Sequence, residues 1–284
     1  MAAQQQVTVV TDSTSYLPAG LADELNVKVV PLQVQLGGRT GLEGQDVTPA
    51  DVTAALRVRT AVTTSRPTPA EFVEVYRSAL DAGASTVVSL HLSAELSGTC
   101  DSARLAAGEF EPDVIRVIDS RSTAMALGFA VLAAARAAAT GAGPQDVEQA
   151  ARTTLGRTSA LFYVDSLEWL HRGGRIGSAA ARFGTALAVK PLLHLSDGRI
   201  MPLEKVRTAS KAIARLVQLT VQRAGSDPVD VAVQHLAAPG RAAEVAGLLK
   251  QGLPNLGQLY ESEVGAVVGA HVGPGLLGVV VSRR

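Results

Sequence analysis

Mostly apolar runs of residues alternate with segments of helical periodicity through the first half of the chain. Runs of this kind are typical of strands that are buried on both faces of a parallel sheet. Four of them predict strands, at residues 7–10, 27–34, 86–92 and 114–118. Because helical patterns separate the runs, the alternation predicts a parallel sheet covered by helices.

Threonine–proline pairs mark two helix starts. Thr48 and Thr68 are each placed to cap a helix whose first residue is a proline, Pro49 or Pro69. A threonine hydroxyl accepts a hydrogen bond from a free amide of the first helical turn, and proline is tolerated there because it lacks that amide hydrogen. Glu71 stands three residues after Thr68, which completes a capping box. Helices are therefore predicted to begin at residues 49 and 69.

The pattern changes after about residue 156. Two apolar runs, at residues 189–195 and 200–206, flank Asp197-Gly198, a pair that favours a tight hairpin turn. Three further strands are predicted at residues 229–235, 264–268 and 276–282. We therefore predict two domains, an N-terminal α/β domain at residues 1–155 and a C-terminal α/β domain with antiparallel pairing at residues 156–284.

Charge and composition exclude several classes of protein. The chain has 284 residues with 26 Lys+Arg and 26 Asp+Glu, so it lacks the basic excess of a nucleic-acid-binding protein. The single cysteine, Cys100, excludes a disulfide framework and a cysteine-based metal centre. Residues 1–6 do not resemble a signal peptide, and the apolar run at 122–135 is too short to span a bilayer. We expect a cytoplasmic protein with a buried helix at 122–135, no membrane insertion and no metal.

Hydroxyl-rich and acidic segments follow three of the predicted strands, and a fourth precedes a helix. Each could be no more than a helix cap. In a parallel sheet, however, the carboxyl ends of the strands meet at one edge, where ligands bind. Hydroxyls and free helix amides at such an edge suit an anion. The four segments are residues 11–15, 93–99, 119–122 and 63–67.

His271 is the histidine with the most suggestive surroundings, because it ends an apolar run and glycines flank it. We expect these glycines to permit the close approach of a ligand. A hydrolase triad of Ser97, His271 and Asp12 can also be assembled, although Ser97 lacks the G-x-S-x-G context of a nucleophile elbow. The G-x-G-x-x-G match at residues 273–278 is rejected as a nucleotide loop, because no helix follows it.

A loop at residues 170–177 contains two glycines between Arg172 and Arg175. Basic residues and glycine are usual at the end of a helix, where they complement the helix dipole and permit the closing turn. The same arginines could instead contact a phosphate or a protein partner. The sequence leaves both interpretations open.

Seven short motifs occur along the chain, and together they resemble the DegV family of bacterial fatty-acid-binding proteins. Arg66 replaces the glutamine of the family's T-S-Q-P motif, and Ala94 replaces the second serine of S-S-x-L-S-G-T. The motifs lie at residues 12–15, 63–67, 93–99, 119–120, 167–176, 190–208 and 269–275.

The resemblance implies an N-terminal three-layer α/β/α domain with a mainly parallel sheet and a C-terminal α/β domain with an antiparallel sheet. It also implies an apolar tunnel for one long-chain fatty acid, such as palmitate, stearate or oleate, with the carboxylate at the domain interface. The family pattern assigns the carboxylate to Thr64, Ser97 and His271. The supporting positions that it implies are Thr63, Ser65, Ser93, Gly98, Ala270 and Gly273.

Some members of the family present their fatty acid to a separate ATP-binding kinase subunit, which forms an acyl-phosphate. Arg175 and Arg207 match the family arginines that are implicated in this exchange. The resemblance thus implies a monomeric carrier with no cofactor and no catalysis of its own. The alternative is an acyl-ester hydrolase that uses Ser97 and His271.

Overall fold

The computed structural model describes residues 6–176 and 190–284. Gly177, the last residue of the arginine–glycine loop, and Val189, the first residue of a predicted strand, lie outside the described residues, as does most of the segment 1–6. The chain forms two compact units, one of residues up to 33 and 65–156, the other of residues 34–64 and 157–284. Residues 34–64 thus belong with the C-terminal part of the chain, whereas the domain boundary predicted from the sequence assigns them to the N-terminal domain at residues 1–155.

The first unit contains a four-stranded sheet in which every strand pair is parallel. Its order is β2 (Lys28–Val30), β1 (Val7–Asp12), β6 (Thr86–His91) and β7 (Ile115–Asp119). Proline interrupts the predicted strand at 27–34 at Pro31, so the chain leaves this sheet after Val30. The predicted parallel sheet is confirmed.

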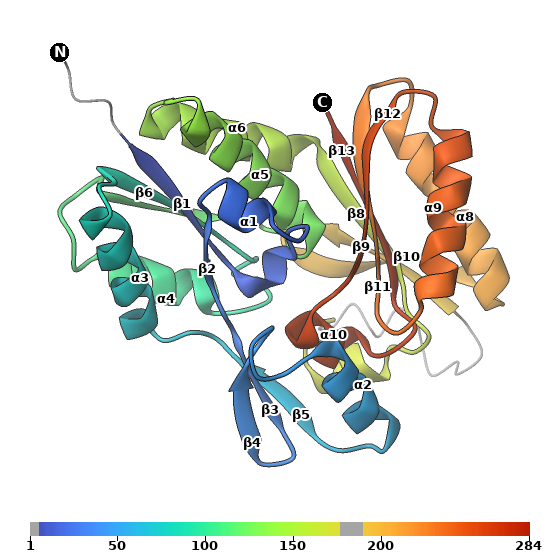
Figure 1. The fold of residues 1–284 in the computed structure, drawn as a ribbon. Helices are drawn as coiled ribbons and strands as arrows, with labels where there is room; N and C mark the ends of the chain where they lie inside the picture. Colours follow the sequence, from blue (N-terminus) through green and yellow to red (C-terminus); the bar gives the residue numbers. More distant parts are fainter. Residues whose placement is uncertain (1–5, 177–189) are drawn as a thin grey trace. The chain divides into compact units, whose positions relative to one another are not determined.

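Helices cover both faces of this sheet (Figure 1). Phe72 and Tyr76 of α3 and Ala103 of α4 pack with Val10 and Val87 of the sheet. Helix α5 packs against β1 and β6 from the other side, and most of its residues are buried, which confirms the predicted core helix. The helices of this unit are η1 (Ser13–Ser15), α1 (Leu21–Glu24), α3 (Pro69–Asp81), α4 (Thr99–Ala107), α5 (Met125–Ala139) and α6 (Pro144–Arg157).

The second unit has a six-stranded sheet that is antiparallel except for the pair β11–β12. Two helices, α8 (Ala209–Ala224) and α9 (Pro239–Gly252), pack on one face around a core of aliphatic side chains. Asp197 and Gly198 form the predicted hairpin turn, both with positive φ. The order is β10 (Arg199–Val206), β9 (Lys190–Ser196), β8 (Thr158–Tyr163), β13 (Leu277–Arg283), β11 (Val229–His235) and β12 (Leu256–Glu263).

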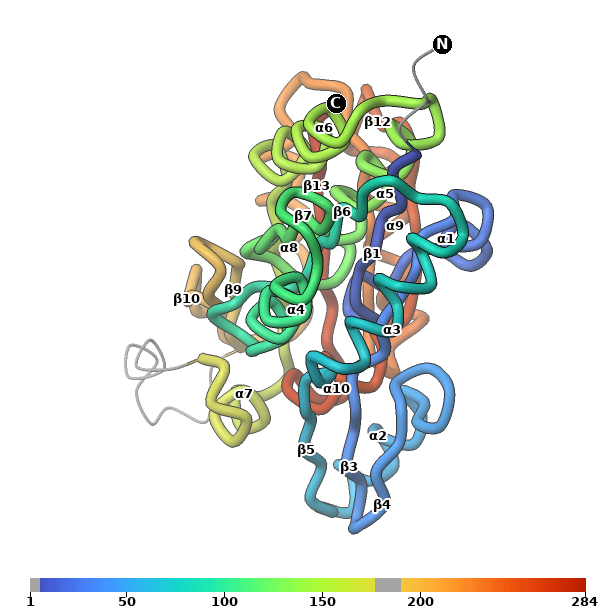
Figure 2. The backbone as a smooth tube through the Cα atoms, turned by 90° about the vertical axis from the view of Figure 1, so that its left-hand side faces the viewer, coloured from blue at the N-terminus to red at the C-terminus, as the bar shows by residue number. Residues whose placement is uncertain are grey.

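A small three-stranded sheet and three short helices complete the second unit (Figure 2). Helix α10 packs against α2 and α7, which joins residues 34–64 to the C-terminal part of the chain. The capping threonines predicted for α2 and α3 are confirmed, and Asp51 gives α2 a capping box as well. The elements are β4 (Arg39–Leu42), β3 (Gln33–Leu36), β5 (Val62–Ser65), α2 (Pro49–Arg57), α7 (Glu168–Arg172) and α10 (Ala266–Val272).

The strand predicted at residues 264–268 is wrong, because these residues enter α10. A short apolar run does not by itself distinguish a buried strand from a buried helical turn. The strand of this region is β12, which lies earlier in the chain and is partly exposed at the edge of the sheet. No helix of residues 6–176 or 190–284 is long and apolar enough to cross a membrane.

Candidate functional site

A cavity of about 300 Å³ lies within the second unit, where β5, the end of α7 and the end of α10 meet. Its size is at the lower end of the range for small-molecule sites. The side chains around it are apolar, hydroxyl-bearing or basic, and no acidic residue lines it among the residues that the structure describes. They include Leu56, Val62, Thr63, Thr64, Trp169, Arg172, Arg175, Ala270 and His271.

Thr64 and His271 meet at this cavity. The hydroxyl oxygen of Thr64, on β5, lies 2.8 Å from Nε2 of His271, in the last turn of α10. The other ring nitrogen, Nδ1, is buried and has no hydrogen-bond partner within the described part of the chain. Gly173 is packed against it so closely that a Cβ there would lie 2.2 Å from Nδ1. The imidazole is therefore held between a hydroxyl and bare backbone.

The electrostatics of the cavity favour an anion. Burial, and to a smaller extent the positive charge of Arg175, lower the pKa of His271 to about 4. His271 is consequently neutral at pH 7, so the threonine and the imidazole present polar groups without a fixed charge. Arginine remains protonated in proteins, so Arg175 gives the lining a positive charge, whereas the charge of Arg172 is paired with Glu168 at 2.7 Å. A carboxylate fits this combination of neutral hydrogen-bonding groups and cations.

Ser97 belongs to the first unit, in the loop between β6 and α4. Its hydroxyl lies 2.9 Å from the hydroxyl of Thr99 and accepts a hydrogen bond from the Thr99 amide. Arg66, which replaces the family's glutamine, lies against this loop and donates to the carbonyl of Gly98 at 3.4 Å. A Cβ at Gly98 would lie 1.9 Å from the Arg66 guanidinium, so glycine makes room for the arginine. The substitution therefore adds a cation beside the Ser97 loop.

The supporting positions have several different roles. Thr63 and Ser65 donate across the small sheet to glutamines of β3, and Thr63 and Ala270 also line the cavity. Ser93 is buried; its backbone carbonyl accepts the amides of Leu96 and Ser97 and its hydroxyl accepts the Glu95 amide, which closes the turn at Ser97. Ala94, the other departure from the family pattern, donates its amide to Asp119.

The glycines that follow His271 make room for protein side chains. A Cβ at Gly273 would lie 2.0 Å from the indole of Trp169, and one at Gly275 would lie 2.1 Å from the carboxylate of Asp165. Both have positive φ, which glycine adopts without strain. Gly273 and Gly275 are therefore required by their protein neighbours, and their part in admitting a ligand stays a prediction.

The two candidate partner-contact residues lie in different settings. Arg175 is half-buried, lines the cavity and donates to the carbonyl of Gly173. Arg207 is exposed and directly precedes Thr208, the N-cap of α8. Within the described ranges, no group of histidine, cysteine or acidic side chains could hold a metal ion.

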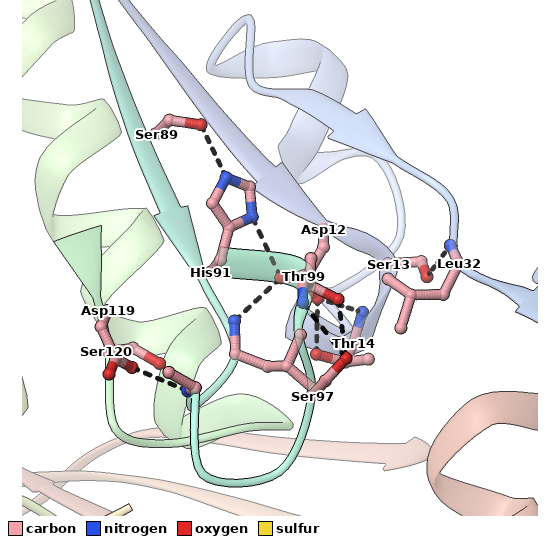
Figure 3. A network of polar contacts seen from close by, with 12 residues as sticks. Asp12, Ser13, Thr14, Leu32, Ser89, His91, Ser97, Thr99, Asp119 and Ser120 are labelled. Carbon is pink, nitrogen blue, oxygen red and sulfur yellow. Dashed lines mark hydrogen bonds and ion pairs between the residues drawn. The ribbon is translucent and has the colours of Figure 1, made fainter. Parts of the chain in front are cut away.

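The sequence reasoning missed a buried polar network in the first unit (Figure 3). The carboxylate of Asp12 lies 3.1 Å from Nδ1 of His91, whose Nε2 lies 2.6 Å from the hydroxyl of Ser89. That hydroxyl also bonds Tyr76. Asp12 further accepts the amides of Thr14 and of the residue after His91. Ser89 and His91 are two residues apart on β6, so their side chains lie on the same face of the strand. This spacing was the signal in the sequence from which the pair could have been found.

This network also bears on the hydrolase triad. Asp12 is fully buried, and both of its carboxylate oxygens accept hydrogen bonds from His91, Thr14 and Leu92. It therefore orients His91 rather than His271. Ser89, which completes a serine–histidine–aspartate arrangement, is itself fully buried and out of reach of a substrate. The network stabilises the first unit, and nothing in its geometry exposes a nucleophile.

Comparisons with known proteins agree with the motifs. A family model with the description "Uncharacterised protein, DegV family" matches residues 6–284. A DegV domain-containing protein of Streptomyces coelicolor is 56% identical over 280 residues, which cover 99% of each chain. Protein DegV of Bacillus subtilis is 35% identical over 276 residues, 96% of this chain and 98% of its own.

Two solved structures share the fold over nearly the whole chain. A DegV family protein from Thermus thermophilus, described by its fatty-acid binding, has a TM-score of 0.93 and 35% identity over 98% of this chain and 100% of its own. DegV from Bacillus subtilis, described as a fatty acid binding protein, has a TM-score of 0.90 and 34% identity over 99% and 100% of the two chains. The predicted fold class is confirmed, and the chain belongs to the DegV family.

Proposed function

We propose that this protein binds a long-chain fatty acid and holds the carboxylate at Thr64 and His271. The observation that carries the proposal is the Thr64–His271 hydrogen bond in a cavity lined by two arginines and by no described acidic residue. The fatty-acid binding described for the Thermus thermophilus and Bacillus subtilis relatives supports it.

The energetics of such a ligand separate into two parts. Burying an acyl chain contributes about 0.8 kcal/mol per methylene, or roughly 10 kcal/mol for a C16 chain before the entropic costs of binding. A buried carboxylate opposes binding by several kcal/mol unless hydrogen bonds and charge compensate it. Chain burial therefore provides affinity, whereas Thr64, His271 and the arginines provide selectivity for the acid.

The decisive experiment compares palmitate with palmityl alcohol, which has the same chain and no charge. In His271→Ala we expect palmitate affinity to fall by about tenfold to a hundredfold, the range for a hydrogen bond to a charged group, and alcohol affinity to change by less than about twofold. Isothermal titration or displacement of a fluorescent fatty acid measures both.

His194→Ala is the matched control, because His194 is a half-buried histidine of the same unit that does not line the cavity. It should leave the acid-to-alcohol ratio at the wild-type value. A wild-type protein that binds palmitate and its alcohol equally, or not at all, contradicts the proposal. The contribution of Ser97 stays a prediction, and Ser97→Ala in the same assay tests it. Ester hydrolysis is not proposed, because Asp12 bonds His91.

We further propose that the loaded protein serves a separate ATP-binding subunit, with Arg175 and Arg207 in the exchange. In that step a carboxylate oxygen attacks the γ-phosphorus of ATP, the bond to the bridging oxygen breaks, and acyl-phosphate and ADP form. The exposure of Arg207, and the position of Arg175 on the cavity lining, support these roles.

Arg207→Ala should keep palmitate affinity and slow acyl-phosphate formation by at least about tenfold, because a charge-assisted contact to phosphate is lost. Hydroxylamine trapping with a family ATP-binding subunit measures the product. Arg136→Ala, an exposed arginine of α5, is the control. Equal rates for all three proteins would remove Arg207 from the proposal.

A further inference from the structure

Glu43 is an acidic side chain that the structure buries almost completely, with 6% of its surface exposed. Asp12 is the other buried acid among the described residues. Glu43 follows β4 directly, and an isolated bridge pairs it with Val47 in a tight loop before α2. A buried carboxylate is costly unless hydrogen bonds or charges compensate it, so its contacts indicate what it does.

The Glu43 carboxylate accepts a hydrogen bond of 2.7 Å from the backbone amide of Val267, 224 residues further along the chain. Val267 lies in the first turn of α10. The N-cap residue of this helix is Gly265, which has no side chain to cap the helix. Carboxylates stabilise the positive N-terminal end of a helix. Glu43 is thus a long-range cap for α10.

The other end of α10 is held by the same small sheet. His271, in the last turn, meets Thr64 on β5, and β5 and β4 both pair with β3. Midway along the helix, Gly269 is packed so closely that a Cβ would lie 3.2 Å from Leu236. Figure 2 shows α10 beside α2 at the small sheet. The helix is therefore fixed at both ends and has little room to shift.

We propose that Glu43 is a positioning residue that holds α10 where His271 meets Thr64, and so sets the selectivity of the site for a carboxylate over an uncharged head group. The inference rests on the proposed function, which it deepens. Glu43 itself does not line the cavity and has no contact with the ligand in this proposal. It acts through the seven residues of α10.

The control must separate this role from ordinary helix capping. Glu71 is suitable, because its side chain caps α3 by accepting the Thr68 amide, and α3 belongs to the first unit. Glu71→Ala should lower the melting temperature without changing the ratio of palmitate to palmityl alcohol affinity. Glu43→Ala should reduce that ratio by about tenfold, the loss expected when a hydrogen bond at the head group is misplaced.

Glu43→Gln keeps an oxygen acceptor for the Val267 amide, so only the interaction of the charge with the helix dipole is lost. Its ratio of palmitate to palmityl alcohol affinity should therefore stay within about threefold of the wild type. If Glu43→Ala does not fold, Glu43→Asp replaces it, since a side chain shorter by one methylene falls short of the amide. A wild-type ratio in a folded Glu43→Ala or Glu43→Asp protein overturns the inference.

Two readouts do not depend on fatty-acid binding. In Glu43→Ala the NMR signals of the His271 ring should shift, and the amides of residues 267–272 should exchange faster with solvent, whereas Glu71→Ala should change neither. If the wild type shows no preference for the acid, the proposed function fails, and these signals still test whether Glu43 positions α10. Unchanged signals in Glu43→Ala overturn the positioning role by themselves.

Discussion

Replacing Asp12 with alanine should lower the free energy of unfolding by about 3–5 kcal/mol, the range for removing one partner from a buried charged network. The carboxylate of Asp12 and the imidazole of His91 are both fully buried. Without the carboxylate, the His91 ring and the amides of Thr14 and Leu92 lose their acceptor at once. Urea denaturation followed by circular dichroism measures the change.

Asp23→Ala is the matched control, because Asp23 is an exposed aspartate of the same unit. Exposed substitutions usually change stability by less than about 0.5 kcal/mol. The free energy of unfolding of Asp12→Asn should lie between those of Asp12→Ala and Asp23→Ala, since an amide retains one acceptor oxygen. If Asp12→Ala were as stable as Asp23→Ala, the network would not stabilise the first unit. Loss of ester hydrolysis in a folded Asp12→Ala protein would instead point to catalysis at this network.

Local sequence signals predicted the elements whose cause is local. Thr48 with Pro49 and Thr68 with Pro69 mark the helix starts, because a cap and its amide lie within one turn of each other. Asp197-Gly198 likewise specifies the β9–β10 hairpin through its own backbone preferences. Short motifs of neighbouring residues were enough to predict these elements.

Elements whose cause is distant in the chain were missed. Helix α10 forms where an apolar run also suits a strand, and its cap is Glu43, which no sequence window around His271 contains. The segment 34–64 joins the second unit for the same reason, because its contacts with α10 are made across more than 200 residues. Such contacts become visible only when the chain is folded.

The candidate site shows the same division. The motifs singled out Thr64 and His271, and the structure brings this pair together at 2.8 Å. The protein neighbours of the surrounding glycines were not predicted, since sequence shows that a glycine is present but not which neighbour requires its small size. Gly173 faces the His271 ring, and Gly273 faces Trp169. The glycines thus set the shape of the cavity lining through protein contacts.

Gly273→Ala is the second substitution for which we expect a large effect. Gly273 has φ +74° and ψ 168°, a region that other residues enter only at a cost of about 1–3 kcal/mol. An added Cβ would also lie 2.0 Å from the Trp169 indole, so the ring or the loop must move. Together these effects should lower the free energy of unfolding by about 3 kcal/mol and displace a side chain that lines the cavity.

Trp169 is the only tryptophan of the chain, so intrinsic fluorescence reports its displacement directly. In the folded Gly273→Ala protein we expect a shifted emission maximum and weaker palmitate binding. Gly247→Ala is the control, because Gly247 lies within α9 and a Cβ there meets nothing within 4 Å. Alanine is favoured over glycine in a helix by up to about 1 kcal/mol, so this variant should be more stable with unchanged emission. Equal stability and emission for the two variants would show that the backbone at Gly273 and the indole do not constrain each other, and the packing account of the motif at residues 269–275 would then fail.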